Sequence, residues 1–436
     1  MASLDTQNFF NACNPSKTLR IERADDRLFY IDFSSVRGSD VIQRLQRTIV
    51  QSNASTCQLF TGHIGCGKST ELFRLKSELE KKKFHVVYFE SSADLDMADV
   101  DISDILLAIT RQVSASLEQI GIRLKPKYFI NLFAEIADFL QTPIELSAEK
   151  EFSLPMGIGK VTAKTKDSPK LRSQLRQYLE PRTSSILEAI NLEVLGRASE
   201  LLREQGYAGL VVIIDNLDRV DSSPKSTGRS QPEYLFIDRG EQLKKLNCHV
   251  VYTIPLVLIF SNELSTLTNR FGVKPLVLPM VTAITRTQGD HAEGMPLLRQ
   301  MVLARAFPYL SPDHRLLKIT EVFETPETLD RLCRVSGGHV RNLLVLLYSC
   351  LQEADPPITQ ACLEMVIREY RDDLISAISD DEWILLRQII ENQDNVKGEE
   401  EYQTLLRSMF LFEYRDIEGR WFDINPAIAE SKKFRL

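Results

Sequence analysis

The stretch that decides the fold is GHIGCGKS (Gly62–Ser69), which fits the pattern G-x-x-x-x-G-K-[ST] at every position. It follows a short apolar run, residues 56–61, and it opens a predicted helix over residues 69–83. Glycines in such a loop permit positive φ angles and leave room for an anion among the backbone N–H groups. The stretch therefore predicts a phosphate-binding loop between a strand and a helix.

The polar groups of this loop have expected roles. Lys68 should reach the β- and γ-phosphates of a nucleotide, Ser69 should ligate Mg²⁺, and the helix N-terminus adds its positive end. Thr70 is expected at the α-phosphate, although a capping or packing role explains it nearly as well. Cys66 is either a reactive thiol at the helix start or, more simply, a small residue tolerated there. The remaining phosphate contacts are expected from Gly62, Gly65 and Gly67.

The pattern around the loop alternates between strands and helices. Residues 85–91 form a largely apolar run, and further runs are LVVIID (210–215), HVVYTI (249–254) and PLVLPM (275–280). A long amphipathic helix is predicted over residues 182–204. Strands joined by helices favour a parallel sheet, so the expected fold class is α/β, a P-loop NTPase core of five strands.

Two segments fall outside this alternation. The aromatic and β-branched residues of 27–38 predict a short strand that ends at Gly38, before a helix over 41–50. Residues 99–181 are an insertion between the second and third strands. Its Gly-, Pro-, Ser- and Lys-rich part, 153–182, predicts a flexible tip.

The C-terminal part reads as helices until its last residues. Helical periodicity over 295–306, 326–335, 340–354 and 358–377 predicts an all-α lid, and helices over 381–391 and 400–408 precede two alternating runs around Gly419. Helices followed by such a hairpin suggest a winged helix. The predicted domains are an N-terminal segment (1–50), the P-loop core (51–283), the helical lid (284–377) and a winged-helix-like domain (378–436).

Composition excludes several classes of protein. The chain has 436 residues, 43% hydrophobic and 26% charged, which is typical of folded soluble proteins. Its net charge of −7 argues against coating nucleic acid by bulk charge. The longest apolar run has about twelve residues where a membrane span needs roughly twenty. No secretory signal is recognisable at the start, and seven scattered cysteines favour a reducing compartment, so we expect a cytoplasmic protein.

The segment LVVIIDNLDR (210–219) is the second stretch that carries candidate site residues. A buried strand that ends in Asp215 places this carboxylate beside the phosphate loop, where it would hold Mg²⁺ through water. Many related ATPases carry a glutamate base directly after this aspartate, but here the residue is Asn216. Asp218 is then the preferred general base. Alternatively, Asp218 caps a helix or forms a salt bridge, and hydrolysis is slow.

With the loop, the DNLD strand end and the all-α lid, the chain resembles the AAA+/STAND group of P-loop ATPases, with a winged helix beyond the lid. Within that group it is similar to bacterial ATPases related to the origin-recognition and NACHT-like proteins. The resemblance covers most of 40–436, but its specific motifs are only the phosphate loop and 210–219. The absence of a glutamate at position 216 departs from the AAA+ pattern and agrees better with the D-x-x-D of STAND proteins.

The resemblance implies three further site residues. Thr253 would be the sensor that reads the γ-phosphate or its water, or else a strand hydroxyl with a local bond. Arg270 lies where these ATPases carry an arginine finger for a neighbouring subunit, although an ordinary surface arginine fits as well. Arg341 opens a lid helix after two glycines, as sensor 2 arginines do, and His339 is the alternative.

Charge differs sharply between two segments. Residues 160–182 carry seven basic side chains and two acidic ones, a net charge of +5, which suits a nucleic acid, an acidic partner or simply a solvated loop. The winged-helix-like part, 380–436, has thirteen acids and eight bases, a net charge of −5. A helix in this part would be repelled by DNA, so we expect it to pack against protein.

The function that these patterns favour is an ATP- and Mg²⁺-binding switch with slow hydrolysis. It would act on a protein partner or a separately encoded effector, in bacterial defence or mobile-element systems, and it could form homo-oligomers. The alternatives are a DNA-associated regulator, similar to transposon target-selection or initiator ATPases and gripping DNA through 160–182, and a non-hydrolysing nucleotide-binding scaffold.

Overall fold

Five parallel strands form the central sheet of the protein, in the order β2-β3-β4-β1-β5. The computed structural model describes residues 3–139, 154–166, 168–222, 224–225, 228–391 and 400–435. The strands are β1 (Cys57–Gly62), β2 (Phe84–Glu90), β3 (Gly209–Asp215), β4 (His249–Thr253) and β5 (Leu276–Leu278). The five predicted strands and the α/β class are thus confirmed. Because all strands run the same way, Gly62, Asp215 and Thr253 end at one edge of the sheet.

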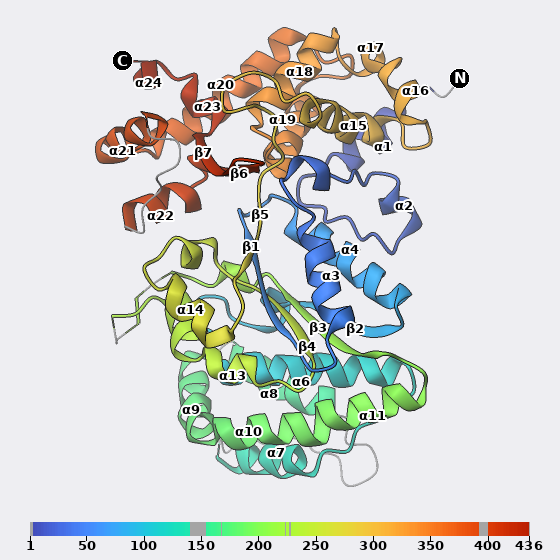
Figure 1. The fold of residues 1–436 in the computed structure, drawn as a ribbon, viewed down its shortest axis with the longest axis vertical. Coiled ribbons are helices and arrows are strands. Elements are labelled where there is room, and N and C mark those ends of the chain that lie inside the picture. Colours follow the sequence, from blue (N-terminus) through green and yellow to red (C-terminus); the bar gives the residue numbers. More distant parts are fainter. Residues whose placement is uncertain are drawn as a thin grey trace.

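Helices cover both faces of this sheet, which gives three layers (Figure 1). One face packs against α3 (Val41–Gln51) and α4 (Lys68–Lys81), and the other packs against α6 (Ile102–Gln119), α10 (Thr183–Ala189) and α11 (Arg197–Glu204). The strand residues alternate accordingly: Val86 belongs to the α3–α4 side and Val87 to the α6 side. The helix predicted over 182–204 is continuous, but its middle, Ile190–Gly196, is π-helical.

Two predictions about local structure are wrong. Residues 27–38 form no strand. They are a loop with a 3-10 turn at Ser34–Val36, and Phe33 and Val36 pack into the lid core instead of joining a sheet. The predicted flexible tip is mostly helical, with α8 (Leu154–Lys166) and α9 (Pro169–Leu179), because its apolar residues pack with α6 and α7 (Lys127–Phe139). The part of this insertion at 140–153 lies outside the described residues.

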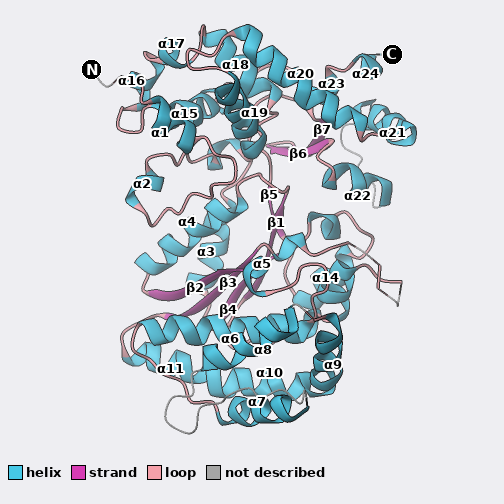
Figure 2. Cartoon of the chain, turned by 180° about the vertical axis from the view of Figure 1, so that it is seen from behind, coloured by secondary structure: helices cyan, strands magenta, loops and turns pink. Residues whose placement is uncertain are grey.

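The predicted lid helices are all present and share one core. They are α15 (Gly294–Ala306), α18 (Pro326–Val335), α19 (Val340–Glu353) and α20 (Gln360–Ser376). The N-terminal helix α1 (Thr6–Ala12) packs beside α15, as both ribbon views show (Figures 1 and 2). The shorter helices are α2 (Ala24–Arg27), α5 (Ser91–Asp94), α12 (Gln231–Glu233), α13 (Gly240–Lys244), α14 (Leu264–Phe271), α16 (Pro312–Leu316), α17 (Ile319–Val322), α23 (Pro426–Ala429) and α24 (Lys432–Arg435).

The C-terminal winged helix consists of α21 (Asp380–Glu391), α22 (Glu400–Arg407) and the hairpin β6 (Leu411–Asp416) and β7 (Gly419–Ile424). The hairpin is buried on both faces. Phe412, Tyr414 and Trp421 share a core with α3 and α4, whereas Leu411, Phe422 and Ile424 share one with α21 and α22. The winged helix is therefore packed directly onto the α/β core, beside the predicted phosphate loop. No helix in the described part of the chain is both long and apolar enough to cross a membrane.

Candidate nucleotide-binding site

The loop between β1 and α4 has the backbone geometry that its glycines predict. Gly65 and Gly67 have φ angles of +88° and +102°, which L-residues with side chains rarely adopt. A Cβ at Gly65 would also lie 2.8 Å from Cε1 of His339 and 2.9 Å from Cβ of Arg341. The loop can therefore curl around an anion only with glycine at these positions, and the lid closes against it.

Lys68 has an acceptor for each of its three ammonium hydrogens. Its Nζ donates to the carbonyl oxygens of Gly62 and His63 at 2.8 and 2.9 Å, and it pairs with Asp218 Oδ2 at 2.9 Å. The two side chains are only 6% and 5% exposed. Burial is the largest single influence on Lys68 and lowers its pKa, but the charge of Asp218, the hydrogen bond to it and the nearby Cys66 and Asp215 together raise the net pKa. Lys68 is therefore charged, and Asp218 is its counter-ion.

Asp215 and Ser69 meet at the edge of the sheet, as predicted. Asp215 is completely buried and accepts hydrogen bonds from the Tyr88 hydroxyl at 2.7 Å, from the Asn216 N–H at 2.7 Å and from Ser69. Burial, followed by the nearby charge of Asp218, raises the pKa of Asp215. A buried carboxylate beside a hydroxyl is an oxygen donor set that suits Mg²⁺.

A turn brings Asp218 to the loop. Asn216 adopts the left-handed conformation, with φ of +62°, directly after β3, and its side chain donates to Glu90 Oε2 at 3.2 Å. The one-turn helix Leu217–Arg219 follows and directs Asp218 toward Lys68. The Oδ1 atom of Asp218 is buried without a hydrogen-bond partner. Asp218 thus lines the same pocket as the phosphate loop, with one carboxylate oxygen that has no partner.

Arg37 is a site residue that the sequence reading missed. It is 3% exposed and donates from Nη2 to the Cys66 carbonyl at 2.8 Å, while its Nε and Nη1 are buried without partners. Buried donors without acceptors are unfavourable unless a ligand satisfies them. They line the same pocket as the phosphate loop, so the residues present fit a phosphorylated nucleotide.

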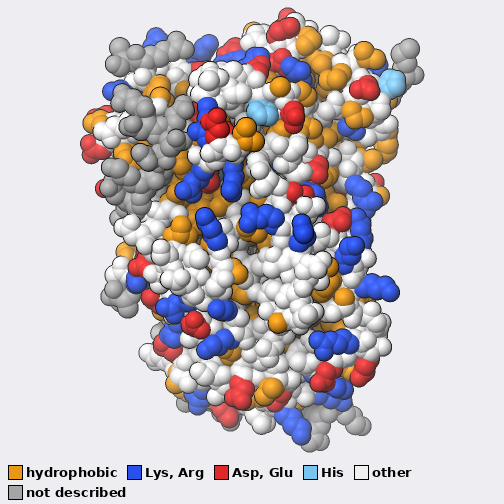
Figure 3. All heavy atoms as spheres, viewed as in Figure 1, with side chains coloured by type: hydrophobic (Ala, Val, Ile, Leu, Met, Phe, Trp, Pro, Cys, Tyr) orange, Lys and Arg blue, Asp and Glu red, His pale blue; other side chains and the backbone are white. Residues whose placement is uncertain are grey.

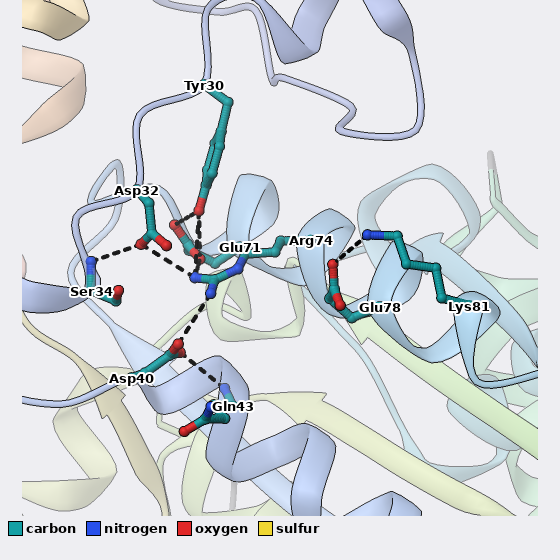
Figure 4. A network of polar contacts seen from close by, with 9 residues as sticks. All are labelled: Tyr30, Asp32, Ser34, Asp40, Gln43, Glu71, Arg74, Glu78 and Lys81. Atoms are coloured by element: carbon teal, nitrogen blue, oxygen red, sulfur yellow. Dashed lines mark hydrogen bonds and ion pairs between the residues drawn. The ribbon is translucent and has the colours of Figure 1, made fainter.

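The N-terminal segment forms the outer wall of this pocket. The pocket encloses about 870 Å³, its open mouth included, and its apolar lining includes Leu19, Phe29, Phe33, Met301 and Leu344. A polar network anchors the segment to α4 (Figure 4). Arg74 pairs with Asp40 at 3.0 Å and with Asp32 at 3.4 Å, and the Tyr30 hydroxyl bonds Glu71. The aromatic run 27–33, predicted as a strand, is therefore the wall where a nucleotide base would lie.

The lid contributes residues to the same pocket. Arg341 lines it together with Arg219, and its backbone N–H donates to the Gly65 carbonyl at 3.2 Å. Burial, and next the charge of Arg219, lower the pKa of Arg341. The His339 ring bonds the Ile64 carbonyl through Nε2 at 2.8 Å and caps α19 by accepting from the Asn342 N–H at 3.0 Å. Of the two lid candidates, Arg341 faces the pocket and His339 holds the loop.

The winged helix reaches the loop from the other side. The N–H of Glu413 in β6 donates to Nε2 of His63 at 3.1 Å, and the Glu413 carbonyl accepts from the Met280 N–H at 3.0 Å. Burial, His339 and Lys68 together lower the pKa of His63 to about 3. His63 is therefore neutral and connects the phosphate loop to the hairpin. The sequence pattern treats position 63 as arbitrary, so it offered no signal for this contact.

The other predicted residues are distributed between the pocket and the fold. Thr70 lines the pocket. Cys66 is buried, with Sγ 3.8 Å from the Leu278 carbonyl. Thr253 is fully buried beneath the end of β3, where its hydroxyl donates to the Ile214 carbonyl at 3.2 Å and accepts from the Leu217 N–H at 3.0 Å. Arg270 lies on α14, outside the pocket lining, and its Nε is buried without a partner.

The three arginines of the basic segment 160–182 form internal contacts. Arg172 pairs with Asp96, and Arg176 pairs with Asp99 at 2.5 Å and with Asp104 at 2.9 Å. Arg182 stacks on the Tyr178 ring at 3.8 Å. The side chains of Lys160, Lys164 and Lys166 lie outside the described residues. The arginines of this segment therefore hold the insertion together and are not free for phosphates.

No protein-family model matches the chain, and no curated protein matches it. Among solved structures it is similar to the ORC2 protein of Aeropyrum pernix in its ADPNP–ADP complexes, with 13% identity and a TM-score of 0.42 over 100% of this chain and 97% of that one. A Walker-type ATPase of Pyrococcus abyssi has 12% identity and a TM-score of 0.44 over 98% and 100% of the two chains. Cdc6p from Pyrobaculum aerophilum has 13% identity and a TM-score of 0.36, over 94% of this chain and 97% of that one.

Proposed function

We propose that the protein is an ATP-binding and ATP-hydrolysing switch of the AAA+/STAND type. The observation that carries the proposal is the convergence of Lys68, the Ser69–Asp215 pair and the unpartnered donors of Arg37 on one pocket. The Asp215-x-x-Asp218 order favours the STAND branch.

Ser69 and Asp215 would hold Mg²⁺, which neutralises charge that develops on the phosphates. The phosphates and the base would be held by other residues of the chain. Loop N–H groups and Arg37 bind and orient the phosphates, while the N-terminal wall excludes water from the base. Tyr88 keeps the Asp215 carboxylate in place through its 2.7 Å hydrogen bond.

Hydrolysis is proposed to begin with an exchange of partners at Lys68. A phosphate that reaches Lys68 competes with Asp218 for the same ammonium group, because all three ammonium hydrogens have acceptors already. Asp218 then loses its counter-ion and becomes a stronger base, which can take a proton from the attacking water. In the non-hydrolysing scaffold that remains the alternative, Asp218 serves only as the counter-ion.

The switch would act through the elements that touch the loop. His339 joins it to lid helix α19, and His63 joins it to the hairpin of the winged helix. A loop that rearranges around phosphate must change both contacts. The net charge of −5 over 380–436 favours a protein partner for this domain, which in a bacterial defence role would be a separately encoded effector.

Lys68→Ala tests the assignment of the site. Affinity for Mg·ATP should fall by at least about a hundredfold, because the variant loses the ammonium group placed between the loop and Asp218. Lys81→Ala, at the exposed end of the same helix, should bind as the wild type does. Binding is measured by calorimetry and folding by circular dichroism. Wild-type affinity in a folded Lys68→Ala variant would disprove the proposed site.

A further inference from the structure

A second cavity lies between the edge strand β5 and the winged-helix hairpin. It encloses about 970 Å³, its open mouth included, which is comparable to the nucleotide pocket. Its lining is both basic and apolar, and none of these residues lines the nucleotide pocket. It comprises Arg44, Ile259, Leu264, Lys274, Pro275, Leu276, Val277, Glu413, Arg415 and Arg420.

Four basic side chains line this cavity. Within the described residues, Arg44, Lys274, Arg415 and Arg420 form no ion pair. They come from α3, the approach to β5, and both hairpin strands. Figure 3 shows Lys and Arg side chains gathered in a band across the middle of this face, at the level of β5 and β6 in Figure 1. A chain with a net charge of −7 therefore concentrates unpaired cations at one hollow.

Two of these cations face each other across the hairpin. Arg415 and Arg420 are direct partners in the β6–β7 register. Like charges directly opposite each other destabilise a β-hairpin, so the pair is unfavourable unless an anion lies between them. The Arg420 guanidinium also lies over the Phe260 ring, 5.0 Å from its centroid. This contact keeps the guanidinium at the cavity.

The inner end of the cavity carries a polar atom without a partner. Glu413 is 2% exposed, lies on the same hairpin face as Arg415, and has an Oε2 atom with no hydrogen bond. Burial raises its pKa to about 7, against the opposing charges of Arg420 and Arg415. Near neutral pH Glu413 can therefore carry a proton and donate it in a hydrogen bond to an anionic oxygen.

We propose that this cavity binds a small phosphorylated organic anion, with its phosphates on Arg415, Arg420 and Lys274 and its less polar part against the wall of Ile259, Leu264 and Val277. The apolar wall and the buried Glu413 favour a small molecule over a nucleic-acid strand, which would need an open, continuous groove. The backbone N–H of Glu413 donates to His63 of the phosphate loop. Glu413 therefore connects an occupant of this cavity to the nucleotide site.

Binding is tested with two probes, inorganic tripolyphosphate and the dinucleotide pApA, in the Lys68→Ala chain so that the phosphate loop contributes little. Both should bind in calorimetry, and both should raise the melting temperature. In the double variant Lys274→Gln/Arg415→Gln the affinities should fall at least tenfold. These side chains are exposed, so the fold should survive. Arg203→Gln, an exposed arginine on α11, is the matched control and should change neither affinity.

The proposal is overturned if neither probe binds at millimolar concentration, or if the double variant and Arg203→Gln give equal affinities. A 20-nucleotide DNA strand provides the third arm. If it binds more than tenfold tighter than pApA and the double variant abolishes this binding, the surface is a nucleic-acid site and the small-molecule assignment is wrong. Because every comparison is made between cavity variants, the outcome does not depend on whether the phosphate loop binds ATP.

Discussion

At the scale of single residues, the site is defined by which charges are paired and which are not. Lys68 has a full set of acceptors, whereas Arg37 keeps two buried N–H groups without any. The ammonium group of Lys68 must give up a partner to bind phosphate, whereas the guanidinium of Arg37 has donors that are not yet used. Both groups line the same pocket. In the proposed mechanism, phosphate gains new hydrogen bonds at Arg37 and exchanges existing ones at Lys68. Asp218 would be the residue released by this exchange.

Asp218→Asn separates its two roles. The amide cannot accept the proton of the attacking water, so turnover should fall by roughly 10²- to 10⁴-fold. ATP affinity should be equal to or higher than that of the wild type, because the variant removes a negative charge that competes with phosphate for Lys68. Single-turnover kinetics and calorimetry measure the two quantities. Asp355→Asn, in an exposed loop, is the control. Unchanged turnover would place the base elsewhere, and no turnover in the wild type would favour the scaffold.

The residues of the loop and of the β3 end could be predicted because their chemistry is local in sequence. The spacing from Gly62 to Ser69 and the position of Asp215 after an apolar run require no knowledge of the rest of the chain. Arg37 and Tyr88 could not be predicted, since each meets the site through a contact with a residue 29 or 127 positions away, and nothing in their own neighbourhood marks them. His63 lies inside the loop pattern, but its bond to Glu413, 350 positions away, could not be predicted either.

At the scale of elements, the same distinction explains the fold. Buried strands are continuous apolar runs and amphipathic helices are periodic, so β1 to β5 and the lid helices were predictable. The aromatic residues of 27–33 satisfy a strand pattern equally well, but they form a pocket wall anchored by Arg74 (Figure 4). The glycines at 157 and 159 suggested a flexible tip, yet Ile158 and Val161 are buried and keep α8 helical.

The junction of lid and loop should be sensitive to acid. Burial lowers the pKa of His339 from 6.5 to about 4, so the folded state resists its protonation. The neutral His339 ring contributes roughly 3 kcal/mol to the free energy of unfolding. This contribution is fully present above pH 6.5 and is lost as the pH falls to about 4. Glu413 acts in the opposite sense, since its pKa is raised to about 7 and its contribution is lost as the pH rises from 4.5 toward 7.

His339→Asn isolates the histidine. Asparagine still caps α19 but does not titrate, so the free energy of unfolding should fall less between pH 6.5 and 4 than in the wild type, by about 3 kcal/mol. Urea unfolding at pH 7, 6, 5 and 4 gives the slope of the free energy of unfolding against pH for each chain. His314→Asn, at an exposed position on α16, should keep the wild-type slope. Equal slopes for His339→Asn and the wild type would contradict the assignment.

At the scale of the whole molecule, the hairpin β6–β7 stands between the two pockets. Its Glu413 bonds the phosphate loop through the backbone and faces the basic cavity through its side chain. Changes at either pocket must pass through a strand that is buried on both faces, so they cannot be absorbed locally. The lid, the winged helix and the core would in this way move together in the proposed switch, which leaves the outer surfaces for the proposed partners.

Arg270 is half-buried on α14 and lies outside the lining of its own chain's pocket, as a finger that acts on a second copy must. An arginine finger contributes about 10³- to 10⁵-fold in rate when a neighbour places it at the phosphates. ATPase activity per molecule should therefore rise with protein concentration. Arg270→Ala should flatten this rise and leave ATP affinity unchanged, while Arg368→Ala, exposed on α20, should behave as the wild type does.

Mixing provides the decisive measurement for assembly. The Arg270→Ala chain keeps an intact pocket and lacks the finger, whereas the Lys68→Ala chain keeps the finger and lacks the pocket. If subunits act on one another, the mixture should recover activity that neither chain shows alone, because each supplies the group that the other has lost. Steady-state rates of the two variants, alone and at equal concentrations, are sufficient. Activity that is independent of concentration and insensitive to Arg270→Ala would mean that each chain hydrolyses ATP with its own residues, and Arg37 and Arg341 would then be the cations that face the phosphates.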